Sequence, residues 1–151
     1  MPAVRLAQYE LCDLIPHAGR MCLLREVAEW DEGRIVCTAT SHRDLGNPLR
    51  SQGRLSAVHA LEYGAQAMAV HGGLKARALG GEIRPAYLAA LRDVKLGVQR
   101  LDTLEDPLLI EATCLLAECS NLIYAFMVSS GATAVAAGRA IIVTNPEACR
   151  T

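Results

Sequence analysis

The chain has 151 residues, 52% of them hydrophobic, with a formal net charge of -1 and a pI near 6.4. This length fits one domain with enough apolar surface for a core, so we expect a single domain over residues 1–151. Aromatic residues make up only 4%, and nucleic-acid binding is excluded because it usually needs a basic surface and stacking rings. Neither a membrane span nor a signal peptide is apparent, so we expect a cytoplasmic protein.

The chain contains six cysteines: Cys12, Cys22, Cys37, Cys114, Cys119 and Cys149. None forms a C-x-x-C pair, most lie in apolar runs, and the expected compartment is reducing. We therefore predict buried thiols rather than disulfides. Cys/His clusters with ligand spacing are missing, so we predict no metal site.

The N-terminal third predicts a helix followed by a β-hairpin. Residues 6–14 have a helical pattern that Pro16 ends. Residues 21–30 and 34–41 are predicted as strands on either side of an Asp-Glu-Gly turn. A polar loop over residues 42–54 then leads to the next element.

Residues 56–79 form the one long helix that the sequence predicts. Ser56 is its expected N-cap, and Gly80-Gly81 its expected stop. Over most of its length Glu62 is the only formally charged residue, and small side chains occur all round it. A helix that is apolar on every side must be buried, and small side chains let a sheet pack closely against it.

Four strands are predicted after the helix, over residues 87–100, 108–119, 122–130 and 133–143. Their connections are short, so we expect antiparallel meander pairing. The Ala-rich last segment could instead be helical by propensity, and its β character lies mainly in Ile141-Ile142-Val143. One buried helix among six strands predicts an α+β fold of two layers, the helix against a curved antiparallel sheet.

Three polar residues converge on the predicted helix. His59, Glu62 and Gln66 are spaced i, i+3 and i+7, so they share one face. Burying a lone carboxylate is unfavourable unless it is neutralised or hydrogen-bonded, so Glu62 has either a structural partner or a function. We interpret Glu62 as a candidate catalytic residue, and Gln66 as its orienter and a candidate substrate-binding residue. His59 is either a packing residue or a second catalytic group.

Residues 14–27 read Leu-Ile-Pro-His-Ala-Gly-Arg-Met-Cys-Leu-Leu-Arg-Glu-Val and are similar to the opening LPHRxPFLLVDRV-type stretch of the bacterial 3-hydroxyacyl-ACP dehydratase family. Residues 61–67, Leu-Glu-Tyr-Gly-Ala-Gln-Ala, look like its E-x-x-A-Q helix segment. The chain resembles in particular the dehydratase-like proteins of aryl-polyene clusters, through Asn47-Pro48, Gly53-Arg54-Leu55 and residues 62–74. The resemblance implies a hot-dog fold, in which a curved sheet wraps a long central helix.

The resemblance also implies an activity, the dehydration of 3-hydroxyacyl-ACP or CoA thioesters to trans-2-enoyl thioesters without a cofactor. Typical members carry a catalytic histidine in a Gly-His-Phe-Pro loop, and here Pro48 occupies the corresponding position. The candidate substitutes are His59 and His17. We expect His42 at the surface and His71 in packing. The thioester oxygen needs N–H donors, which we expect from the backbone at the helix start: Leu55, Ser56, Ala57 and Val58.

Two other functions stay open: a hot-dog thioesterase, for which one helix carboxylate suffices, and a non-catalytic partner of an active dehydratase. We expect a homodimer or a heterodimer with another hot-dog subunit, because the fold leaves a strand edge that needs covering. The middle of the chain is positively charged, which indicates either a solvated surface or docking of an acyl-carrier protein with its phosphopantetheine thioester. The docking candidates are Arg50, Arg54, Lys75, Arg77 and Arg84.

Overall fold

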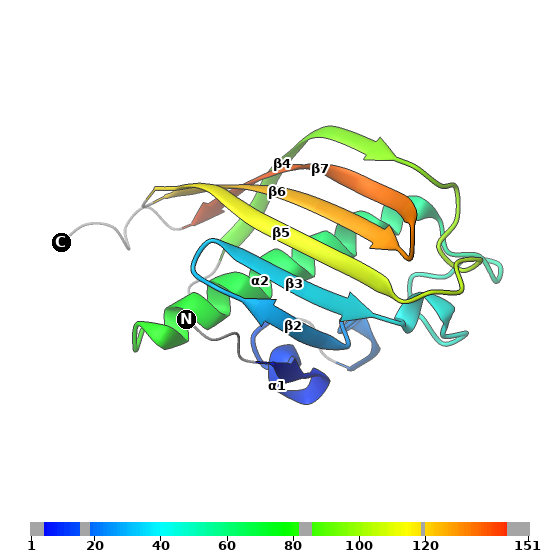
Figure 1. Cartoon of the computed structure of the whole chain (residues 1–151), viewed down its shortest axis with the longest axis horizontal. Coiled ribbons are helices and arrows are strands. Elements are labelled where there is room, and N and C mark those ends of the chain that lie inside the picture. The colour runs from blue at the N-terminus through cyan, green and yellow to red at the C-terminus, as the bar shows by residue number, and fades with distance from the viewer. Residues whose placement is uncertain (1–4, 16–18, 82–85, 119, 145–151) are drawn as a thin grey trace.

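The fold comes from a computed structural model that describes residues 5–15, 19–81, 86–118 and 120–144. The strands are β1 (Leu6–Ala7), β2 (Glu26–Trp30), β3 (Arg34–Ala39), β4 (Ala86–Leu96), β5 (Leu108–Ala117), β6 (Asn121–Ser130) and β7 (Thr133–Thr144). The α-helices are α1 (Gln8–Cys12) and α2 (Ala60–Ala78), and short 3-10 turns occur at Gly19–Met21, Ser41–Arg43 and Ala57–His59. All seven strands join one antiparallel sheet in the order β1-β2-β3-β5-β6-β7-β4, and α2 lies behind it in Figure 1.

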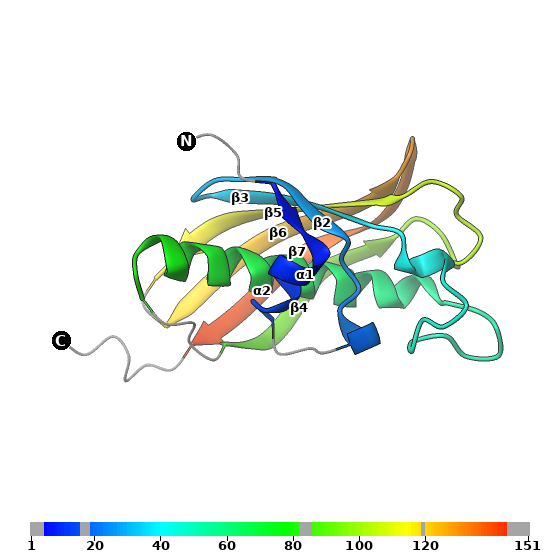
Figure 2. The ribbon, with the colours of Figure 1, turned by 90° about the horizontal axis from the view of Figure 1, so that it is seen from below.

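The long helix α2 is the centre of the core, as its composition predicts. Figure 2 shows it running along the length of the sheet, with α1 near β2. Small residues allow this close packing: a Cβ atom added at Gly64 would lie 3.1 Å from the ring of Phe126 on β6. One added at Gly73 would lie 3.2 Å from Leu14, which follows α1. Within the described residues, no helix combines the length and apolar character needed to cross a membrane.

Both predicted ends of the long helix are confirmed. Ser56 precedes the turn Ala57–His59, which continues into α2, and its hydroxyl accepts a hydrogen bond from the amide of Val58. At the other end, Gly80 adopts a φ of 71°, a left-handed conformation that glycine accepts without steric penalty. The amides of Gly80 and Gly81 then donate to the carbonyls of Arg77 and Ala76. These bonds satisfy carbonyl groups that the end of a helix leaves without partners.

The four strands after α2 lie close to the predicted ranges, but their order differs from a simple meander. β5, β6 and β7 pair consecutively, and the Ala-rich last segment is a strand. The expected pairing of β4 with β5 is wrong, since β4 pairs with β7 while β5 pairs with β3. The connection after β4 explains the difference. Ala57 donates to the carbonyl of Gln99, and Leu101 donates to that of Leu55, so the chain crosses beside the start of α2.

The first predicted helix and strand are shorter than expected. The helix over 6–14 contracts to α1 at Gln8–Cys12 and is preceded by the short strand β1. The strand over 21–30 begins only at Glu26. Before it, the backbone of Met21 and Leu23 binds the side chain of Gln66.

Cys12 and Cys22 form a disulfide, so the prediction that they are thiols is wrong. Their Cα atoms lie 5.9 Å apart, an ordinary separation for a disulfide. Nothing in their sequence spacing indicates the bond. It depends on the tertiary fold, which places the end of α1 beside the segment that leads to β2.

The remaining cysteines agree with the prediction where the structure describes them. Cys37 is a buried free thiol and Cys114 a half-buried one. Burial raises the pKa of the Cys37 thiol to about 12, so this thiol stays protonated and unreactive. Cys119 and Cys149 lie outside the described residues.

Candidate functional site

Gln66 and Glu62 form a hydrogen-bonded pair on α2, which confirms the expected contact between them. Gln66 is 1% exposed. Its Nε2 donates to the carbonyl of Met21 at 2.6 Å and to Oε1 of Glu62 at 3.2 Å, while its Oε1 accepts from the amide of Leu23 at 2.9 Å. An amide nitrogen has two protons, so both donor bonds form together. Gln66 therefore joins α2 to the segment before β2 and orients the Glu62 carboxylate.

Glu62 lies half-buried in the first turn of α2. The bond from Gln66 fixes one carboxylate oxygen, while the side chain keeps contact with solvent. A carboxylate held in this way can exchange a proton with a bound molecule, provided that the molecule comes within hydrogen-bond reach. The geometry thus suits the acid–base role that the sequence suggests for Glu62.

A second buried polar cluster connects α2 to the loop after β3. The Ser41 hydroxyl donates to the carbonyl of Leu23 at 2.7 Å, so it must accept from the Tyr63 hydroxyl, 2.8 Å away. Asn47 Nδ2 in turn donates to the Tyr63 oxygen at 3.3 Å and to the carbonyl of Ser41 at 2.9 Å. Burial raises the pKa of Tyr63, which keeps its hydroxyl a neutral donor. Sequence reasoning found Asn47 only within a motif and assigned Tyr63 no role.

The start of α2 offers fewer N–H donors than expected. The amide of Leu55 already donates to Oδ1 of Asp102 at 2.9 Å, and that of Ala57 donates to the carbonyl of Gln99 at 3.0 Å. The amide of Val58 makes only a long bond of 3.4 Å to the exposed Ser56. Of these three amides, only that of Val58 is weakly engaged by the protein itself.

The histidines differ in their environments. His59 lies half-buried where the turn Ala57–His59 meets α2, one helical turn before Glu62. His17 lies outside the described residues. His71 is buried in packing, as predicted, with Nδ1 2.6 Å from the Tyr124 hydroxyl and Nε2 2.7 Å from the carbonyl of Asp31.

His42 is fully buried, so its expected surface position is wrong. It belongs to the 3-10 turn Ser41–Arg43, and its Nε2 lies 3.0 Å from the carbonyl of Leu104. The sequence places His42 in a polar loop, which predicts exposure. Only the tertiary packing of that loop against the connection before β5 buries it.

Burial lowers the pKa of both His42 and His71, which predicts acid sensitivity. The unfolded chain then binds protons at a higher pH than the native state does. The unfolding free energy is thus retained above a pH of about 6.5 and falls as the pH drops below it. Urea unfolding between pH 7.5 and 5.5 should show this loss. His71→Gln should reduce the slope of the unfolding free energy against pH. If both His71→Gln and His42→Gln left the slope of the unfolding free energy against pH unchanged, this dependence on the two histidines would be contradicted.

The predicted positive surface is divided between the two ends of α2. Exposed Arg54 precedes the helix, while half-buried Lys75 and exposed Arg77 lie in its last turn. A helix of 19 residues is about 28 Å long at a rise of 1.5 Å per residue. Arg50 is engaged within its own loop, since its guanidinium donates to the carbonyls of His42, Asp44 and Gly53. Arg84 lies outside the described residues.

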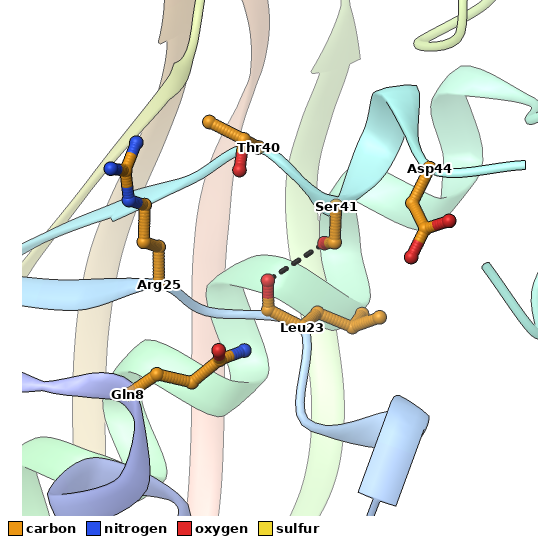
Figure 3. A pocket seen from close by; sticks show the side chains of 6 residues that line it. All are labelled: Gln8, Leu23, Arg25, Thr40, Ser41 and Asp44. Atoms are coloured by element: carbon orange, nitrogen blue, oxygen red, sulfur yellow. Dashed lines mark hydrogen bonds between the residues drawn. The ribbon is translucent and has the colours of Figure 1, made fainter. Parts of the chain in front are cut away.

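A polar pocket of about 270 Å³ lies beside Leu23 (Figure 3). It is lined by Gln8, Leu23, Arg25, Thr40, Ser41 and Asp44. The carbonyl of Leu23 accepts from Ser41 here, while its amide donates to Gln66. The lining includes neither Glu62 nor a histidine. Among the described residues, no group of three or more His, Cys, Asp or Glu is placed to hold a metal.

Comparison with known proteins agrees with this architecture. The model of a family named ApeP-like, described as ApeP dehydratase, matches residues 9–151. The chain is 25% identical to a chain of the dehydratase heterocomplex ApeI:P from Xenorhabdus doucetiae, with a TM-score of 0.80 and coverage of 89% of this chain and 90% of that chain. No curated protein matches the chain.

More distant structures share the fold alone. One is a hypothetical thioesterase protein with coenzyme A from Streptococcus pneumoniae, 12% identical with a TM-score of 0.58, covering 79% of this chain and 84% of that chain. Another is the E. coli PaaI protein from the phenylacetic acid degradation operon, 15% identical with a TM-score of 0.57, covering 78% and 80%. The predicted α+β hot-dog fold is confirmed.

Proposed function

Because the chain belongs to the ApeP-like dehydratase family, we propose that it dehydrates 3-hydroxyacyl thioesters to trans-2-enoyl thioesters and uses Glu62 as an acid–base group. The observation that carries this proposal is the Glu62 carboxylate, oriented by buried Gln66 in the first turn of the central helix. In the reaction a base removes a proton from C2, and an acid protonates the hydroxyl that leaves C3. Glu62 is suited to either step, since each needs one well-placed ionisable group.

We propose further that a second hot-dog subunit completes the site. The loop over residues 46–50 has no histidine, which leaves this chain with fewer acid–base groups than the dehydratases it resembles. A similar solved structure is a dehydratase heterocomplex. β4 lies at the edge of the sheet with β7 as its neighbour, and its Tyr87 and Leu88 are 68% and 47% exposed. Such an edge is suited to pairing with a strand of another subunit, either a second copy or a different one.

Purified protein and a 3-hydroxyacyl-carrier substrate test these proposals, with no metal or cofactor added. The assay measures the enoyl product and free acid, first with the isolated chain and then with a second hot-dog subunit from the same operon. Enoyl product that requires the second subunit supports a shared site. Free acid would instead indicate a thioesterase. The absence of both products in every combination would overturn the proposal. We propose that the reaction takes place in the cytoplasm.

Acyl-carrier protein is the proposed donor of the substrate, and Arg54 is its proposed contact. Exposed Arg54 lies before the helix turn that carries Glu62, whereas Arg77 lies at the opposite end of α2. Arg54→Glu should raise the apparent KM for carrier-bound substrate by about two- to fivefold, the size of one exposed ion pair, and more at low salt. A short N-acetylcysteamine thioester should not be affected. Arg77→Glu is the matched control; an equal effect of both variants would contradict docking at Arg54.

A further inference from the structure

The Cys12–Cys22 disulfide lies next to the backbone groups that bind Gln66. Cys22 is flanked by Met21, whose carbonyl accepts from Gln66, and by Leu23, whose amide donates to it. This stretch precedes β2 and makes no sheet pairing of its own. Besides the local bond from the amide of Cys22 to the carbonyl of Gly19, side chains hold this stretch, since Ser41 binds the carbonyl of Leu23 as well.

We propose that this disulfide holds the Gln66–Glu62 pair in place, so that its reduction releases the pair and lowers the dehydration activity. The effect on activity rests on the proposed function, whereas the effect on Gln66 rests on the contacts alone. With the disulfide closed, α1 and the segment of Met21 and Leu23 are joined covalently. With it open, Gln66 must keep these backbone groups in place without that link, and Glu62 loses a fixed donor when they move.

The redox step is a thiol–disulfide exchange with a dithiol reductant. Cys22 is 4% exposed and Cys12 is half-buried, so the reductant reaches the sulfur of Cys12 more readily. A reductant thiolate bonds to this sulfur and the Cys12–Cys22 bond breaks, which leaves Cys22 as a thiolate. The second reductant thiol then displaces Cys12. Two electrons pass to the protein, Cys12 and Cys22 end as thiols, and the reductant ends as a disulfide. In a reducing compartment, such bonds are usually transient or redox-sensing.

Hydrogen exchange at the Leu23 amide tests this link without an activity assay. This amide donates to Gln66 Oε1 in the oxidised protein. Reduction by dithiothreitol should speed its exchange by about tenfold or more, because local opening becomes easier. Cys12→Ser should exchange equally fast with or without reductant. Cys114→Ser removes a half-buried free thiol and is the matched control, which should respond to reductant like the wild type.

Activity gives the second readout, measured on the chain with whichever partner its dehydration requires. Reduction should lower kcat by about tenfold and leave KM unchanged, since the change affects orientation of Glu62 rather than substrate binding. Reduced wild type serves as the test if Cys12→Ser fails to fold. Unchanged Leu23 exchange after confirmed reduction would overturn the proposal, as would alkylation showing both cysteines free in protein purified without reductant. If reduction speeds exchange of the Leu23 amide but the protein has no dehydration activity, the link between the disulfide and Gln66 holds and the proposed function is rejected.

Discussion

Replacing Glu62 with Gln is expected to lower the kcat of dehydration by about 10²–10⁴-fold, the usual contribution of a general acid or base. The variant keeps a side-chain oxygen that accepts from Nε2 of Gln66, so the pair on α2 can still form. It lacks the proton that the carboxyl group exchanges with the substrate. Steady-state kinetics on carrier-bound substrate would measure the loss, with and without the second subunit.

The control is Glu105→Gln, which removes an exposed carboxylate from the connection before β5. It should retain full activity. The unfolding free energy of Glu62→Gln should stay within about 1 kcal/mol of the wild type, because the shape of the side chain and the hydrogen bond from Gln66 are kept. Turnover in Glu62→Gln within twofold of the wild type would show that Glu62 is not the acid–base group. The alternative of a non-catalytic partner would then be favoured.

Gln66→Leu is expected to destabilise the protein strongly. The amide of Leu23 and the carbonyl of Met21 both bind Gln66, and Leu23 is buried. A buried polar group without a partner destabilises the native state by about 1–3 kcal/mol, so the loss of two such bonds exceeds the effect of an ordinary substitution. The urea midpoint should fall clearly. The fraction of Gln66→Leu that folds should also have a lower kcat, because Glu62 loses its orienting donor.

Gln66→Glu keeps a side-chain acceptor at this position and removes the side-chain N–H donors. An ionised glutamate still accepts from the amide of Leu23, but it cannot donate to Met21 or to Glu62. Its negative charge is also buried beside the Glu62 carboxylate and the Met21 carbonyl, so we expect an unfolding free energy below that of Gln66→Leu. A decrease of less than about 1 kcal/mol in Gln66→Leu would contradict the role that the contacts assign to Gln66.

The sequence predicts the secondary structure and the Glu62–Gln66 pair because both depend on local spacing. The apolar surface of residues 56–79 requires burial, and a separation of four positions places Gln66 beside Glu62 on any α-helix. The disulfide and the burial of His42 depend instead on contacts between distant parts of the chain. The order of the strands does so too, since the position of β4 follows from the bonds between the start of α2 and residues 99–101.

The placement of β4 also affects how the chain folds during synthesis. β4 leaves the ribosome after α2, yet its partner β7 is synthesised only after two intervening strands, β5 and β6. β3 likewise pairs with β5, which is synthesised only after α2 and β4. Pairings this far apart in sequence form slowly because a long loop must close first. Until β7 emerges, both edges of β4 are open and its apolar residues Leu88 and Leu91 lack their cross-strand neighbours Ile142 and Ala140. The nascent chain is therefore most prone to aggregation in the interval between the synthesis of these two strands.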